Sequence, residues 1–407
     1  MLIQRRTLLG AAATTTLIRN PAAAQNPTIR IGVLNDQSGL YRDDGGPTSA
    51  ICARQAIEEF RSANPALNVE LVVADHQNKP DIGAGIARQW FDQADVDAVV
   101  DVPTSSVALA VNTVCREKNK VMLNSGAATT DLTGAQCSPN TVQWTYDTYM
   151  LAKSTGGATV KAGGDTWFFI TANYVFGQQL QRDTAQFVTA AGGRVLGAAT
   201  YPFPETTDFS ALLLQAQASR AKVLALCNSG GDTINCIKQA REFGLTRTMR
   251  IAAMLMYNSN VQALGQDAAQ GLLMTETFYW DLNDRTRAFM DRIRSKTPNQ
   301  WPNMVQAGCY SAVLHYLKAV ADMGPAAAKA DGRAVVARMK AMPTDDDCFG
   351  PGRIREDGRK LHPAYLFEAK KPSESKGRWD GLKLVATTPA DEAFRPLSEG
   401  SCALIKP

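Results

Sequence analysis

Short apolar runs alternate with segments in which apolar residues recur at helical spacing along most of the chain. Strands are predicted at residues 29–34, 69–74, 98–101 and 121–124 in a first series, and at 167–171, 194–200, 223–227, 251–254 and 272–276 in a second. Helices are predicted between them at 49–63, 81–94, 107–118, 178–191, 209–218, 233–243 and 258–264. Apolar strands that are each followed by a helix are typical of parallel sheets with crossover helices. The two series therefore predict an α/β chain with two doubly wound Rossmann-like lobes.

The remainder of the pattern is less regular. Two more helices are predicted at residues 284–295 and 306–322. From Gly350 onward the chain is rich in glycine and proline, and only residues 365–369 resemble a strand. We therefore expect an irregular C-terminal part.

Polar and small residues follow several of the predicted strands. Ser105 and Ser106 follow the third strand, Ala127 and Ala128 follow the fourth, and Asn228 follows a strand of the second series. In open α/β sheets, ligands bind at the carboxyl ends of the strands, and a helix start offers free N–H groups to an anion. Each hydroxyl could also serve only as a helix cap. Several such loops in two lobes favour a shared ligand site.

The N-terminus has the three parts of a secretory signal peptide. Arg5 and Arg6 precede an apolar run at residues 7–18, and small residues close the segment at 21–24. We expect cleavage after residue 24 and export to the periplasm, through either the general or the twin-arginine route. This segment holds three of the 43 basic residues and none of the 39 acidic ones, which leaves a formal balance of +1. That balance argues against nucleic-acid binding.

Eight cysteines in an exported chain make disulfides plausible, and we expect the pairs Cys115–Cys137 and Cys348–Cys402. Cys227 and Cys236 could equally be buried free thiols. The chain contains no C-x-x-C pair and only three histidines, so no metal site is expected. It also lacks a nucleophile elbow and a phosphate-binding loop. We therefore expect neither an enzyme nor a bound cofactor.

The order of these motifs resembles one family. Residues 29–46, the loop 75–81, Thr104 to Ser106, and residues 123–139 are similar to the extracytoplasmic substrate-binding proteins of ABC importers, branched-chain amino-acid type. The resemblance implies a type I periplasmic binding protein, with three crossovers near 146–148, 276–277 and 346–350. The lobes would comprise 27–146 with 277–345, and 147–276 with 346–370, followed by a tail at 371–407. It further implies a monomer that delivers a small molecule to a permease in the inner membrane.

The resemblance also implies ligand contacts. Ser105, with Ser106 beside it, matches the hydroxyl that binds the ligand carboxylate, and Ala127 with Ala128 matches the next carboxylate-binding loop. Phe176, with Tyr174 nearby, matches a tyrosine near the ligand ammonium. The family's ammonium-binding acid would lie at residues 255–257, where this chain has no acid. We therefore expect a carboxylate without an α-ammonium group.

The other candidate pocket residues are mostly apolar or aromatic, and they favour an aromatic acid. They are Tyr41, Asn228, Met254, Tyr257, Phe278 and Trp280. Phe278 and Trp280 could instead pack in the core. The alternative ligands are branched-chain or other amino acids, and the alternative class is a ligand-sensing receptor domain.

Overall fold

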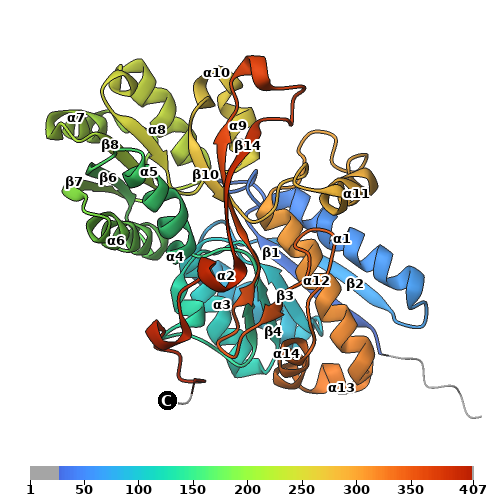
Figure 1. The fold of residues 1–407 in the computed structure, drawn as a ribbon. Coiled ribbons are helices and arrows are strands. Elements are labelled where there is room, and N and C mark those ends of the chain that lie inside the picture. The colour runs from blue at the N-terminus through green and yellow to red at the C-terminus, as the bar shows by residue number, and fades with distance from the viewer. Residues whose placement is uncertain (1–26, 406–407) are drawn as a thin grey trace, which may run out of the picture.

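The computed structural model describes residues 27–405 as two lobes, each built on a parallel sheet (Figure 1). The first sheet has the order β2 (Val69–Asp75), β1 (Ile29–Asn35), β3 (Ala98–Asp101), β4 (Val121–Asn124), β5 (Thr141–Gln143). The second has the order β7 (Arg194–Tyr201), β6 (Thr166–Ala172), β8 (Val223–Cys227), β9 (Arg250–Ala253). The two-lobe α/β fold predicted from the sequence is confirmed. The predicted signal peptide lies outside the described residues.

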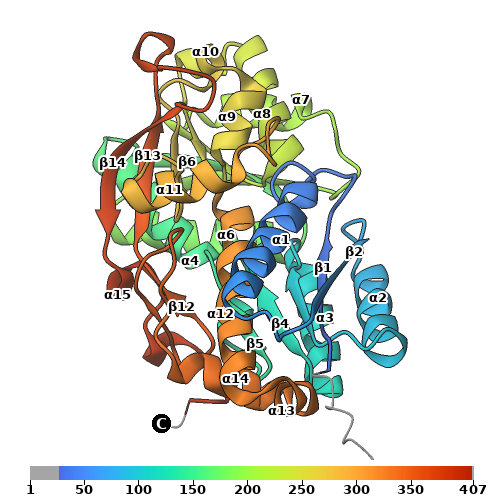
Figure 2. The same cartoon turned by 90° about the vertical axis from the view of Figure 1, so that its right-hand side faces the viewer.

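Helices cover both faces of each sheet (Figures 1 and 2). In the first lobe these are α1 (Gly46–Ala63), α2 (Pro80–Gln93), α3 (Ser105–Lys118), α11 (Asp284–Ile293), α12 (Met304–Met323), α13 (Pro325–Ala330) and α14 (Gly332–Ala341). In the second they are α4 (Thr148–Leu151), α5 (Gly157–Lys161), α6 (Val175–Ala190), α7 (Ser210–Ser219), α8 (Gly230–Glu242), α9 (Asn258–Leu264) and α10 (Gln266–Ala269). Because both faces are covered, the central strands β3, β4, β6 and β8 are buried throughout and therefore read as continuous apolar runs.

A third, antiparallel sheet contains β10 (Leu273–Glu276), β13 (Ala364–Ala369) and β14 (Leu382–Thr388). The sequence pattern predicted the first two strands but missed β14, which we expected to be irregular. Four of the seven residues of β14 are exposed, so it lacks the apolar run that marks a buried strand. Its pairing with β13 supplies the partner that its sequence does not indicate.

Several predicted helices begin earlier in the structure than in the sequence pattern. Helix α3 begins at Ser105 and α8 begins at Gly230, directly after the preceding strand loops. The long helix α12 begins at Met304, where Asn303 caps it and accepts hydrogen bonds from the N–H groups of the first turn. Glycine and serine residues that we interpreted as loop are thus the first helical turns, which brings their N–H groups to the strand ends.

The segment that follows the expected third crossing at 346–350 contacts the first lobe. Two short strands, β11 (Arg353–Ile354) and β12 (Lys360–Leu361), follow that segment. Gln143 of β5 bridges Arg359, whose buried guanidinium donates to the carbonyl oxygens of Thr145 and Tyr146. Residues 353–361 therefore pack against the first sheet, and the chain reaches the second lobe only at β13.

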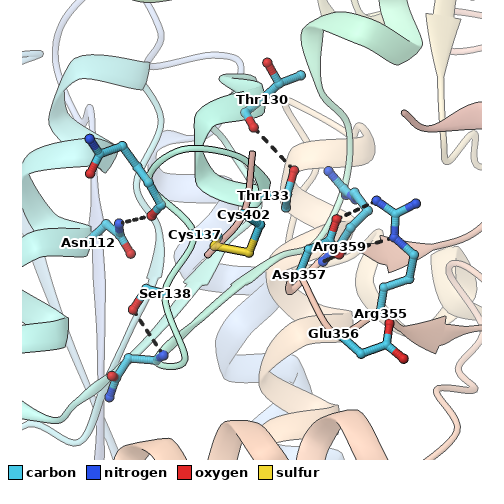
Figure 3. The surroundings of a disulfide bond; sticks show 12 residues. Asn112, Thr130, Thr133, Cys137, Ser138, Arg355, Glu356, Asp357, Arg359 and Cys402 are labelled. Carbon is cyan, nitrogen blue, oxygen red and sulfur yellow. Dashed lines mark hydrogen bonds and ion pairs between the residues drawn. A yellow bond between two sulfur atoms is a disulfide. The ribbon is translucent and has the colours of Figure 1, made fainter. Parts of the chain in front are cut away.

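The C-terminal segment runs from the second lobe back to the first, as Figures 1 and 2 both show. After β14 it forms the short helix α15 (Ala390–Ala393), and Arg395 then donates to the carbonyl oxygens of Thr130 and Thr133. Cys402 closes the segment through a disulfide with Cys137, beside Thr133 (Figure 3). The tail is thus attached to both lobes.

Both expected disulfides are wrong. Cys137 pairs with Cys402, while Cys115 and Cys348 are free thiols buried in the core. Spacing along the sequence does not reveal where a tail returns to the body of the protein, and this return decides the pairing. Cys227 and Cys236 are buried free thiols, which was one of the two alternatives. Within residues 27–405, no helix is both long and apolar enough to cross a membrane.

Candidate ligand-binding site

A cavity of about 340 Å³ lies between the lobes, at the carboxyl ends of the strands of both parallel sheets. The first lobe contributes Tyr41, Asp44, Gly45, Pro103, Thr104, Ser105, Gly126, Ala127, Ala128, Tyr146 and Val305. The second contributes Tyr174, Phe176, Ser229, Leu255 and Tyr257. Its position agrees with the rule for open α/β sheets, in which ligands bind at the carboxyl ends of the strands.

Seven of the residues proposed from the sequence line this cavity, and they come from the segments that follow five different strands. They are Tyr41, Ser105, Ala127, Ala128, Tyr174, Phe176 and Tyr257. The fold brings them together because each follows the end of a parallel strand, and those ends face one another across the two lobes.

Four proposed residues lie outside the cavity lining. Ser106 is half-buried on the next position of α3, and Met254 is part of the hydrophobic core. The Asn228 side chain accepts a hydrogen bond from Thr233 within its own helix start. Trp280 lies in a separate surface recess, where its indole N–H donates to the carbonyl oxygen of Trp379 at 2.8 Å.

Phe278 packs in the core as well. Its ring meets that of Phe289 edge to face, with the ring centroids 5.8 Å apart, and it is fully buried. The alternative that this aromatic segment serves packing is therefore the correct one for Phe278.

Two residues of the cavity lining, Ser105 and Ala128, offer hydrogen-bond donors. Ser105 is the first residue of α3 and is 1% exposed, and its Oγ has no hydrogen-bond partner among the described residues. The first-turn N–H groups of a helix carry a partial positive charge, which favours an anion at this place. In the loop after β4, the Ala127 N–H donates to Asn124 Oδ1 at 3.0 Å. The N–H of Ala128 has no protein acceptor within the described chain.

Four tyrosines form the aromatic walls, and their hydroxyls join the lobes in pairs. The Tyr41 and Tyr174 hydroxyls are 2.6 Å apart, and those of Tyr146 and Tyr257 are 2.9 Å apart. Tyr146 also donates to the carbonyl oxygen of Gly126 at 2.6 Å, so Tyr257 is the donor in their contact. Burial raises the pKa of all four phenols, which keeps them neutral.

An acidic group that the sequence analysis missed also lines the cavity. Asp44 lies in the loop between β1 and α1 and is 5% exposed. Its Oδ1 accepts from Asn260 Nδ2 at 3.0 Å, and its Oδ2 accepts from Ser229 Oγ at 3.4 Å. Burial raises the pKa of this carboxyl from 3.8 to about 7. No Lys or Arg side chain forms an ion pair with it in residues 27–405.

The other lining residues that we did not propose have different origins. Thr104 and Ser229 stand in loops that the sequence analysis quoted, one position from the residues chosen there. Val305 comes from the start of α12, far along the chain from the strand loops. The strand-end rule points to the loop that contains Asp44, because this loop follows the first strand, but the rule does not single out Asp44 among the residues of the loop.

Close contacts hold the lobes together around the cavity. The Gly231 N–H donates to the carbonyl oxygen of Leu40 across the interface at 3.3 Å. Gly230 has φ +59°, and a Cβ at this position would lie 2.5 Å from that same carbonyl oxygen. Glycine is therefore required here for the lobes to approach each other.

The site shows no metal-binding arrangement. No group of three or more His, Cys, Asp or Glu side chains in residues 27–405 could hold a metal ion. His76 is fully buried, and its Nδ1 accepts a hydrogen bond from the Asn78 N–H at 3.0 Å. Burial lowers the pKa of His76 to about 4, so it is neutral and orders its loop.

Comparison with known proteins identifies relatives along the whole described chain. The model of a periplasmic binding protein family matches residues 28–378. A periplasmic binding protein from Burkholderia mallei is 46% identical, with a TM-score of 0.89 over 93% of this chain and 99% of that one. A branched-chain amino acid ABC transporter periplasmic ligand-binding protein from Burkholderia xenovorans LB400 is 38% identical, with a TM-score of 0.81 over 92% and 99%.

A solute-binding protein of an ABC transporter from R. palustris, solved in complex with benzoate, is only 19% identical. Its TM-score of 0.77 over 89% of this chain and 97% of that one shows a common fold. No curated protein matches the sequence. The family model covers most of the chain, and two relatives exceed 30% identity over nearly all of it. The chain therefore belongs to the periplasmic binding protein family.

Proposed function

We propose that this periplasmic binding protein is the solute-binding component of an ABC importer, and that it captures a small carboxylate between its lobes, with an aromatic acid as the first candidate. Ser105 is the observation that carries the proposal. Its buried hydroxyl has no protein partner, and it stands at the positive end of a 14-residue helix inside the cavity. A buried polar group without a partner is costly, and a ligand carboxylate would remove that cost.

The shape and lining of the cavity favour an aromatic body. Tyr41, Tyr174, Phe176 and Tyr257 line the walls, and stacked or edge-to-face packing with a flat ring stabilises such a ligand. Leu255 lines the cavity in the segment where the family resemblance implied an ammonium-binding acid. The benzoate complex of the R. palustris protein demonstrates that this fold accepts an aromatic acid.

An amino acid is the second candidate. The observation in its favour is Asp44, a buried carboxyl in the cavity wall that could pair with an ammonium group. The Burkholderia xenovorans relative is named a branched-chain amino acid binder. The Asp44 carboxyl comes from a different loop than the acid that we expected at residues 255–257.

The remaining parts of the proposal follow from the family. The precursor would lose residues 1–24 on export to the periplasm, and the mature protein would act as a monomer that docks on a permease. We propose lobe boundaries close to those expected, with residues 346–361 moved to the first lobe because Arg359 contacts β5 there.

Calorimetry on the mature protein tests the proposal. Benzoate, 4-hydroxybenzoate, cinnamate and leucine should be titrated separately, after a thermal-shift screen to select concentrations. A ligand at 100 times its dissociation constant stabilises the protein by about 2.7 kcal/mol, which the screen detects readily. Binding of an aromatic acid supports the first candidate. Tight binding of leucine together with no response to any aromatic acid would replace it with the second.

A further inference from the structure

We propose that Asp44 determines ligand specificity: its carboxyl accepts a hydrogen bond from a donor group that the carboxylate ligand carries away from its acid group. This proposal rests on the proposed function and specifies it. The ligand would be bifunctional, with its carboxylate near Ser105 and a hydroxyl or ammonium group near Asp44.

The first argument compares Asp44 with other buried acids of the protein. Asp97 contacts two lysine ammonium groups, and Asp147 lies 3.6 Å from the Arg359 guanidinium. Asp36 accepts from three backbone N–H groups and from Asn78. Each of these carboxyls is therefore stabilised by cations or by several donors. Asp101, Asp232 and Glu276 are also buried and have only neutral partners, but Asp44 is the one of these acids that lines the cavity.

The Asp44 carboxyl has fewer and weaker hydrogen-bond donors. Its two side-chain partners, Asn260 and Ser229, are neutral, and the contact with Ser229 is long at 3.4 Å. A carboxylate has about four acceptor positions, so Asp44 retains unused acceptor capacity beside the cavity. Burial of a carboxyl with so few donors is costly unless a further partner arrives.

The hydroxyls of Tyr146 and Tyr257, which also line the cavity, already donate to other acceptors. Tyr146 donates its proton to the carbonyl oxygen of Gly126, and Tyr257 donates to Tyr146. Neither phenol can therefore donate to Asp44 in this arrangement. A donor group on a molecule in the cavity can therefore use the free acceptor positions of Asp44.

The cavity lining contains both donors and an acceptor. The Ser105 hydroxyl and the N–H of Ala128 can donate, whereas Asp44 presents an acceptor. The raised pKa of Asp44, about 7, has burial as its main cause, with repulsion from Asp43 and Asp36 added. A ligand donor would stabilise the ionised form, as hydrogen bonds to a carboxylate do.

Matched ligand pairs test this assignment. Benzoate is compared with 3-hydroxybenzoate and 4-hydroxybenzoate, and 4-methylpentanoate is compared with leucine, so each pair differs by one donor group. The wild type, Asp44→Asn and the control Asp43→Asn are titrated with every acid. Asp43 is the adjacent acid with a largely exposed side chain, and it does not line the cavity.

We expect the wild type to bind the donor-bearing member of at least one pair ten times or more tighter than its partner, as hydrogen bonds to charged groups do. Asp44→Asn should reduce that ratio at least fivefold, and Asp43→Asn should leave it unchanged. A preference among the benzoates identifies a hydroxyl donor, and a preference for leucine identifies an ammonium.

Equal binding within every pair by the wild type would overturn the assignment of Asp44 and leave the proposed carboxylate function intact. The same holds if Asp44→Asn, folded by circular dichroism, keeps the wild-type ratio. Asp44→Ser, a smaller neutral side chain, serves as the second variant if the asparagine variant does not fold. Failure of every acid to bind the wild type would instead refute the proposed function, and the assignment of Asp44 with it.

Discussion

Replacing Ser105 by alanine should change ligand affinity and protein stability in opposite directions. In the described structure the Ser105 hydroxyl is buried at the start of α3 and has no protein partner. A hydrogen bond from this hydroxyl to a carboxylate contributes about 1.5–3 kcal/mol, because one partner is charged. Ser105→Ala should therefore raise the dissociation constant of the acid roughly 10- to 150-fold.

The same change should stabilise the ligand-free protein. A buried hydroxyl without a partner costs roughly 1–3 kcal/mol, and alanine also has the higher helix propensity. We expect the free energy of unfolding to rise by about 1 kcal/mol, because the surrounding loops relax around the missing oxygen. Denaturant unfolding without ligand measures this gain, and calorimetry with the tightest acid of the panel measures the loss of affinity.

Ser106→Ala is the matched control. Ser106 has the same chemistry at the next position of the same helix, but it is half-buried and does not line the cavity. It should leave the dissociation constant within about twofold, since surface substitutions away from special features change energies by less than about 0.5 kcal/mol. The reasoning fails if both variants lose affinity equally, or if Ser105→Ala binds the acid as tightly as the wild type.

Three further changes test other features. Cys402→Ser opens a crosslink between positions 265 residues apart and should lower the free energy of unfolding by roughly 2–4 kcal/mol, as denaturant unfolding would show. Gly230→Ala should obstruct closure against Leu40 and weaken binding more than tenfold. Gly244→Ala, also at positive φ but with only ordinary van der Waals contacts to the Arg247 side chain, should not. Small-angle scattering with saturating ligand should find only the Gly230 variant more expanded. Burial raises the pKa of Glu276 from 4.5 to about 8, so the folded protein binds a proton at this carboxyl more strongly than the unfolded chain does. The stabilisation by this group is complete below about pH 4.5 and is lost as the pH rises to about 8, so the free energy of unfolding should fall by about 5 kcal/mol over this range. Glu276→Gln should flatten this fall, which denaturant unfolding measures at several pH values.

The amino-acid sequence by itself determined the two-lobe architecture. Fully buried parallel strands such as β3 and β8 must be apolar along their whole length, and the helices between them must have one apolar face. This pattern is local, so it can be read without knowledge of the neighbours. The strand-end rule then identified much of the cavity, including Ser105 and Tyr257, because the carboxyl ends of parallel strands share one edge of a sheet.

Other features depend on where distant segments meet. β14 is half exposed and forms only because β13 lies beside it, and Cys402 reaches Cys137 only because the tail returns to the first lobe. Neither partner can be inferred from spacing along the chain, since the return path is set by the packing of the whole fold.

Asp44 shows the same limit within the site. Its sequence neighbours mark it as an ordinary loop acid, and exposed carboxyls are common in such loops. Only the approach of Ser229 and Asn260 from the second lobe buries it and turns it toward the cavity. The chemistry of this wall is therefore decided by the contact between the lobes, because burial, and not residue type alone, determines what a carboxyl can bind.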